Sequence, residues 1–130
     1  LKALTRLNLS STAVGDEGMI TLAPLTSLAS LLLVDTIVTD RGVISLAPLA
    51  AHLTHLALTG HHCGDAELIA VCSHLSALTR LEMLDNFEGA LGFSEEGMRA
   101  LASLTGLVHL ELENAASDEG LMAISSLTAI

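Results

Sequence analysis

The sequence has few aromatic residues, prolines, cysteines or basic side chains, and two of these shortages bear directly on what the protein can be. Its 130 residues include no tryptophan or tyrosine and two phenylalanines, although 51% of them are hydrophobic. Aliphatic side chains must therefore build the core. No apolar run reaches the roughly 18 residues that a membrane span needs, and no secretory or transit segment is recognisable. Membrane insertion is not expected.

Basic side chains are the second shortage. Five lysines and arginines stand against 15 acidic residues, which gives a formal net charge of −10. Nucleic acids and anionic membranes attract basic surfaces, so we expect neither as a partner. A neutral or basic protein partner is the easier expectation, although acidity by itself also serves solubility.

Catalytic and metal-binding motifs are also missing. The sequence has no G-x-S-x-G, no phosphate-binding glycine loop and no H-E-x-x-H, so we expect no enzyme, no catalytic residue and no cofactor. Zinc requires four converging ligands. The candidates His61, His62 and Cys63, with His52 and His55 nearby, include adjacent histidines that project in different directions. No metal site is predicted there.

What the chain does contain is one pattern, Leu-x-x-Leu-x-Leu, five times over. The copies begin at Leu4, Leu28, Leu53, Leu78 and Leu107, at steps of 24, 25, 25 and 29 residues. Within a copy the leucines alternate with other residues, as in Leu7 and Leu9 around Asn8, and this period of two predicts a strand with one buried face. A fixed period of this length predicts a stacked solenoid of strand-plus-helix units.

The second half of each copy opens with an acid, at Asp16, Asp40, Asp65, Glu95 and Asp118. Asp is a favoured N-cap residue, so these acids are predicted to cap the helices that follow them. Apolar residues three and six positions later, such as Met19 and Leu22, form one face of a helix. Pro24 and Pro48 are predicted to end the first two helices.

On these residues the chain resembles the leucine-rich repeat family over essentially its whole length. Parallel strands need crossover connections, and these are usually right-handed. The expected fold is an α/β, right-handed leucine-rich repeat solenoid, with a concave parallel sheet and short helices on the convex face. Residues 1–130 are expected to form one domain of about five repeats, starting near 4, 28, 53, 78 and 107.

Both chain ends fit the repeat register. Leu1 lies three residues before Leu4, and Ile130 lies three residues after Leu127, as if a repeat were cut at each end. Because an uncapped stack exposes its core, further repeats of the same chain are expected at both ends.

The two cysteines fall on repeat positions that we predict to be core. Cys63 takes the place of Val14 and Val38, and Cys72 takes that of three alanines at 23, 47 and 102. A free buried cysteine behaves as a small hydrophobic residue. Unpaired core thiols favour an intracellular location, in the cytoplasm, a cilium or the nucleus.

A partner is expected to dock on the outward positions of the strands, because repeat packing does not determine them. The residues selected are Arg6, Asn8, Ser30, Leu32, His55, Arg80, Glu82, His109, Glu111 and Glu113. Repeat four also carries five additional residues, within 85–92, and Asp85, Phe87 and Glu88 of this insert are predicted to join the surface. A generic solvated sheet and a tolerated surface loop are the alternatives.

The pattern Val-x-Asp-x-Gly after the strands, as in Val14-Gly15-Asp16-Glu17-Gly18, looks like the cysteine-containing subclass of leucine-rich repeats. That subclass is well represented among F-box ubiquitin-ligase substrate receptors. The resemblance implies a protein–protein interaction module, with a ubiquitin-ligase substrate receptor as one form of it. A scaffold subunit of a large intracellular assembly, such as a ciliary one, and a receptor ectodomain are the alternatives.

Overall fold

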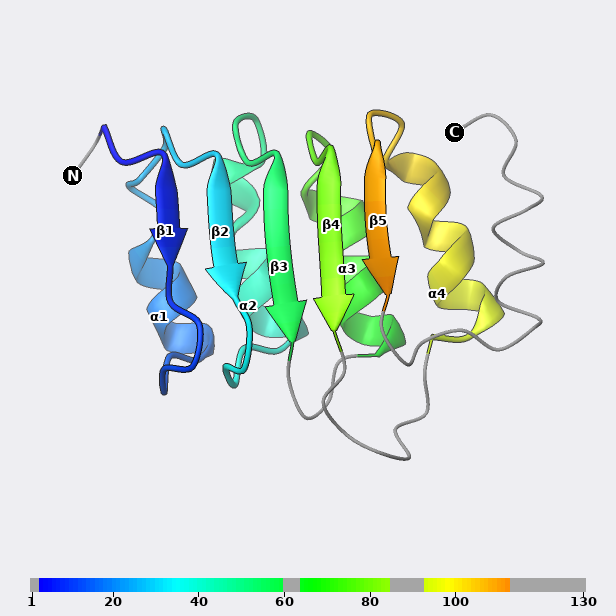
Figure 1. Cartoon of the computed structure of the whole chain (residues 1–130), viewed down its shortest axis with the longest axis horizontal. Helices are drawn as coiled ribbons and strands as arrows, with labels where there is room; N and C mark the ends of the chain where they lie inside the picture. The colour runs from blue at the N-terminus through cyan, green and yellow to red at the C-terminus, as the bar shows by residue number, and fades with distance from the viewer. Residues whose placement is uncertain (1–2, 60–63, 85–92, 113–130) are drawn as a thin grey trace.

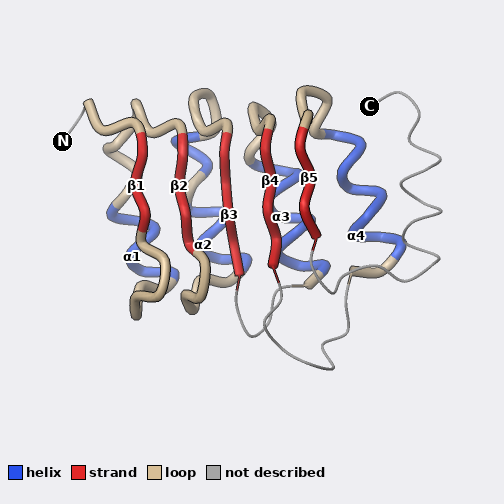
Figure 2. Tube along the Cα trace, viewed as in Figure 1, coloured by secondary structure: helices blue, strands red, loops and turns tan. Residues whose placement is uncertain are grey.

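The computed structural model describes residues 3–59, 64–84 and 93–112, which form one parallel sheet with helices along one face (Figure 1). The five strands follow one another in chain order, and between each strand and the next the chain forms a helix behind the sheet (Figure 2). The strands are β1 (Arg6–Asn8), β2 (Ser30–Leu33), β3 (His55–Thr59), β4 (Arg80–Leu84) and β5 (His109–Leu112). The helices are α1 (Asp16–Thr21), α2 (Asp40–Ser45), α3 (Asp65–His74) and α4 (Glu95–Ala100), with 3-10 helices η1 (Ala47–Leu49) and η2 (Leu101–Ser103).

The strands pair in the register that the repeat predicts. Arg6 pairs with Ser30, Ser30 with His55, His55 with Arg80, and Arg80 with His109. Equivalent residues of successive repeats therefore lie side by side in columns across the sheet. The predicted parallel sheet and α/β architecture are confirmed.

The core lies between the sheet and the helices and consists almost entirely of aliphatic side chains. The inward residues of the three middle strands, and the leucine two residues before each of these strands, are at most 1% exposed: Leu28, Leu31, Leu33, Leu53, Leu56, Leu58, Leu78, Leu81 and Met83. The corresponding leucines of β1 and β5 are only partly buried, because these are the outer strands of the described sheet. The helix residues three and six positions after each acid are also buried: Met19, Leu22, Val43, Leu46, Leu68, Val71, Met98 and Leu101.

Two of the helices end shortly before a proline. Helices α1 and α2 end at Thr21 and Ser45, three residues before Pro24 and Pro48 respectively. Pro48 follows the end of α2 but lies within the 3-10 helix η1, so the chain continues in a helical conformation there. Helix α3 has no proline after it and runs for ten residues to His74. Helix α4 also has none and is six residues long, so proline alone does not set the length of these helices.

The predicted role of the repeat acids as N-caps is wrong. Asp16, Asp40, Asp65 and Glu95 are each the first residue of a helix, and the cap position before them belongs to Gly15, Thr39, Gly64 and Ser94. Asp118 lies outside the described residues. The aspartates at 16 and 65 reach instead to the helix of the next repeat. Asp16 accepts hydrogen bonds from the backbone N–H of Thr39 at 2.7 Å, the hydroxyl of Thr39 at 2.6 Å and the N–H of Gly42 at 3.1 Å.

A second such link joins repeats three and four. Asp65 accepts from the backbone N–H of Ser94 at 2.8 Å and from the Ser94 hydroxyl. Repeat three breaks the series, because Gly64 has no hydroxyl and the place of the helix glycine is taken by Glu67. Glu67 is only 7% exposed and accepts from its own cap residue, Gly64 N–H, at 3.0 Å.

The register prediction for Cys72 is confirmed for the cysteine and wrong for its equivalents. Cys72 is 3% exposed, whereas Ala23 is half-buried and Ala47 and Ala102 are exposed. Helix α3 continues where α1, α2 and α4 have already ended, so among the four repeats whose helices the structure describes, this position faces inward only in repeat three. Cys63 lies outside the described residues.

Candidate functional site

The open sheet face is the side of the sheet away from the helices. Within residues 3–59, 64–84 and 93–112, no helix or strand covers it (Figure 1). It presents two complete columns, which are Arg6, Ser30, His55, Arg80 and His109, and Asn8, Leu32, Ala57, Glu82 and Glu111. Nine of the residues selected from the sequence stand in these columns as predicted. Glu113, Asp85, Phe87 and Glu88 lie outside the described residues.

A chain of polar contacts crosses three strands of this face. The hydroxyl of Ser30 lies 3.0 Å from Nδ1 of His55, and Nε2 of His55 lies 2.7 Å from Oε2 of Glu82. Arg80 donates a hydrogen bond to Oε1 of Glu82 at 3.1 Å. The sequence placed these four residues on one face, but it did not reveal that they contact one another.

Glu82 is the centre of this chain. Its side chain is 15% exposed, against 49% for Arg80. The hydrogen bond from His55 and, to a lesser degree, the guanidinium of Arg80 hold the pKa of the Glu82 carboxyl below its ordinary value, although partial burial acts in the opposite direction. Glu82 is therefore a fixed negative charge at neutral pH.

The acidic part of the face lies where β4 and β5 meet. Glu82 pairs in register with Glu111, and Nε2 of His109 lies 3.8 Å from Oε2 of Glu111. One ligand atom from each of Glu82, His109 and Glu111 lies within 4.8 Å of the other two. No signal in the sequence separates this trio from the other outward residues, because the three converge only when strands 27 to 29 residues apart are paired.

The middle of the open sheet face is apolar, but little of it is exposed. Leu32 and Val34 are half-buried. Ala57, in an outward column, is 3% exposed, because its small side chain stands between the larger Leu32 and Glu82. The exposed part of the face is mainly polar and charged.

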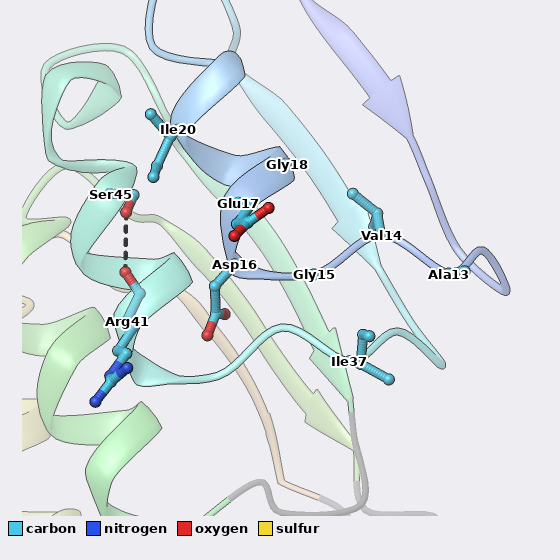
Figure 3. Close-up of a pocket in the computed structure, with 10 residues that line it drawn as sticks. All are labelled: Ala13, Val14, Gly15, Asp16, Glu17, Gly18, Ile20, Ile37, Arg41 and Ser45. Carbon is cyan, nitrogen blue, oxygen red and sulfur yellow. Dashed lines mark hydrogen bonds between the residues drawn. The ribbon is translucent and has the colours of Figure 1, made fainter.

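A second surface, which the sequence analysis missed, lies on the helix side of the molecule. A hollow is lined by residues of α1, α2 and the turns that precede them, including Val14, Gly15, Ile20, Ile37 and Arg41 (Figure 3). Ile20 and Ile37 are 62% and 63% exposed. Both are apolar residues outside the positions that the repeat buries, and that mismatch is the signal that could have identified them.

The comparisons with known proteins agree with this fold. A family model described as a leucine-rich repeat matches residues 2–23, which is the first repeat. The crystal structure of an internalin (inlF) from Listeria monocytogenes strain 4b F2365 is similar to the chain, with a TM-score of 0.50 at 20% sequence identity. The similarity covers 96% of this chain and 46% of the internalin, so the chain spans about half the length of that structure. No curated protein matches the chain.

These comparisons and the sheet topology establish the fold as that of a leucine-rich repeat solenoid. The matched first repeat supports the resemblance to that family that the leucine pattern indicates. In the part of the chain that the structure describes, no helix has both the length and the apolarity needed to cross a membrane.

Proposed function

We propose that this chain is a protein–protein interaction module that binds a neutral or basic protein segment across the open sheet face. The observation that carries this proposal is the row of contacts from Ser30 through His55 to Glu82. Solvated side chains on an idle surface have no need to be ordered in this way, whereas a docking surface benefits from charges that are fixed before the partner arrives.

The charge distribution supports the chemistry of the partner. The chain has a net charge of −10, and the open sheet face carries the side-by-side carboxylates of Glu82 and Glu111. Complementary charge raises the association rate and rejects partners of like charge. Exposed Arg80 and His109 lie in the neighbouring column, so the partner is expected to present a basic residue toward β4 and β5, next to polar groups.

Two finer proposals concern the assembly in which the module works. The Val-x-Asp-x-Gly repeats favour a substrate receptor of an intracellular ubiquitin ligase, and the free buried thiol of Cys72 supports a reducing compartment. A passive scaffold in a large assembly, such as a ciliary one, is the competing proposal. The two proposals predict different proteins that copurify with the chain.

Affinity purification of the protein from its source, with two matched variants, tests these proposals. The first variant changes Arg80, Glu82 and Glu111 on the open sheet face to Ser. The second variant changes Glu17, Arg41 and Glu96 to Ser. These residues are exposed on three different helices, and their replacement alters the net charge by the same amount as in the first variant. We expect one protein to be lost with the first variant only, and direct binding of that purified protein to the wild-type chain confirms the site.

Loss with the second variant only would move the docking surface to the helix side and refute the proposed face. Recovery of ubiquitin-ligase core subunits with both variants supports the receptor proposal. Recovery of one unchanged large assembly with all three forms supports the scaffold and contradicts partner binding through this face.

A further inference from the structure

We propose that Glu82, His109 and Glu111 form a binding site for a divalent transition metal, with zinc as the best-fitting ion. The three residues offer one imidazole nitrogen and two carboxylates, and one ligand atom from each lies within 4.8 Å of the other two. Nitrogen and oxygen ligands of this kind suit zinc, and three protein ligands with an open fourth position form a recurrent type of zinc site. The site is a property of this chain alone, and it does not depend on the proposed partner.

Strand pairing brings the ligands together. Glu82 and Glu111 are registered neighbours on β4 and β5, and paired strands lie roughly 4.8 Å apart. His109 is two residues before Glu111, and therefore on the same face of β5. Zinc ligands stand about 2.0–2.2 Å from the ion, so tetrahedral ligand atoms are roughly 3.3 Å apart. Nε2 of His109 and Oε2 of Glu111 are already 3.8 Å apart.

Rotamer changes of His109 and Glu111 can close this remaining distance without moving the sheet. Their side chains are 48% and 52% exposed, so their rotamers are free to adjust. Glu82 is the fixed member, because it is held by His55 and is only 15% exposed. Binding therefore requires His109 and Glu111 to adjust, while Glu82 is already in place.

The surroundings of Glu82 supply the support that metal ligands usually have. A ligating carboxylate is typically held by a hydrogen bond from a second residue, and here His55 Nε2 lies 2.7 Å from Oε2 of Glu82. A carboxylate offers about four acceptor positions on its two oxygens, so this bond leaves room for an ion. Arg80, which donates to Oε1, has a half-exposed side chain that can turn toward solvent.

Isothermal titration calorimetry of zinc into the chelator-treated protein tests the proposal. We expect one ZnCl2 equivalent to bind per chain, with much weaker binding of MgCl2. His109→Ala and Glu111→Gln should each weaken zinc binding at least tenfold. The control His52→Ala removes an exposed histidine far from the trio in sequence and should leave the affinity unchanged.

A second control addresses the consecutive residues His61, His62 and Cys63. A variant with His61 and His62 changed to Ala and Cys63 changed to Ser should keep the zinc affinity of the wild-type chain. Circular dichroism confirms that each variant is folded, and histidine ring resonances in the wild-type chain should show His109 shifting with zinc. The proposal is overturned if zinc does not saturate a single site, if His109→Ala and Glu111→Gln bind as the wild type does, or if binding is lost with the triple variant.

Discussion

The carboxylate of Asp16 accepts a hydrogen bond at 3.1 Å from the backbone N–H of Gly42, a residue of the next repeat. Gly42 is in the first turn of α2, where backbone N–H groups have no partner within the helix. The aspartate therefore caps the helix of the following repeat and not its own. Asp65 makes the equivalent link to Ser94 before α4, so the same device holds two pairs of neighbouring repeats together.

Asp16→Ala should destabilise the protein more than Asp40→Ala. Each aspartate is the first residue of its helix and favours the helix dipole equally. Among the described residues, however, Asp40 makes no hydrogen bond to α3, whereas Asp16 accepts three bonds from Thr39 and Gly42. Because hydrogen bonds to a charged group are the stronger ones, we expect the free energies of unfolding of the two variants to differ by about 2 kcal/mol. Urea unfolding of both variants measures it, and equal losses would contradict the inter-repeat role.

Gly42→Ala should be destabilising although alanine favours helices. An added Cβ would lie 2.6 Å from Oδ1 of Asp16 and 2.7 Å from Cγ1 of Val38, so it would displace the linking carboxylate. Overpacking of this kind costs about 1–3 kcal/mol, and together with the disturbed hydrogen bonds of Asp16 it outweighs the roughly 1 kcal/mol helix preference of alanine over glycine. The control is Gly106→Ala, where the nearest atom to the new Cβ is 3.9 Å away. In thermal unfolding, the Gly106→Ala control should have a higher melting temperature than Gly42→Ala.

Glu82 should contribute stability that depends on pH. Its pKa is lowered in the folded protein, chiefly by the hydrogen bond from His55. The contribution is therefore fully present above the ordinary carboxyl pKa of 4.5 and is lost as the pH falls through the lower folded value. We expect wild type to be more stable than Glu82→Gln at pH 7, with the difference shrinking below pH 4.5. Denaturant midpoints of both proteins from pH 3 to 7 check this, and a difference that grows on acidification would show the opposite sign.

Cys72 should be unreactive in the folded protein. Burial raises the pKa of its thiol to about 12, so very little reactive thiolate exists at pH 8, and the side chain is only 3% exposed. In a Cys63→Ser variant, the rate at which iodoacetamide labels Cys72 in the folded protein should be lower than the rate in the urea-unfolded protein by a factor on the order of a hundred. Labelling of the folded variant at the unfolded rate would refute burial of this residue.

The strands and the core could be predicted from the sequence because each repeat carries its own pattern. Leu31 and Leu33 alternate with Leu32, and the same alternation at Leu56 and Leu58 fixes the pairing of β2 with β3. A slip by one residue would turn every buried leucine toward solvent. The same register placed Ser30, His55 and Arg80 in one column before any contact between side chains was known.

The contacts between repeats could not be predicted in the same way. Asp16 looked like a local N-cap because the preference of aspartate for that position is a property of one helix, whereas its actual partners are 23 and 26 residues away. The link from His55 to Glu82 spans 27 residues and depends on which rotamers neighbouring strands permit. Ala57 is buried for a similar reason of local context, namely its larger neighbours, and the alanines equivalent to Cys72 are not buried because their helices are shorter than α3.

The sequence by itself determined the solenoid, because the period of the leucines requires a strand and a helix in each repeat and buries them only when repeats stack. Only the tertiary structure decided where each polar side chain finds its partner. A buried leucine is satisfied by any apolar neighbour, since the hydrophobic effect has no direction. A carboxylate or an imidazole requires a particular atom at about 3 Å, and stacking of the repeats alone brings that atom into reach.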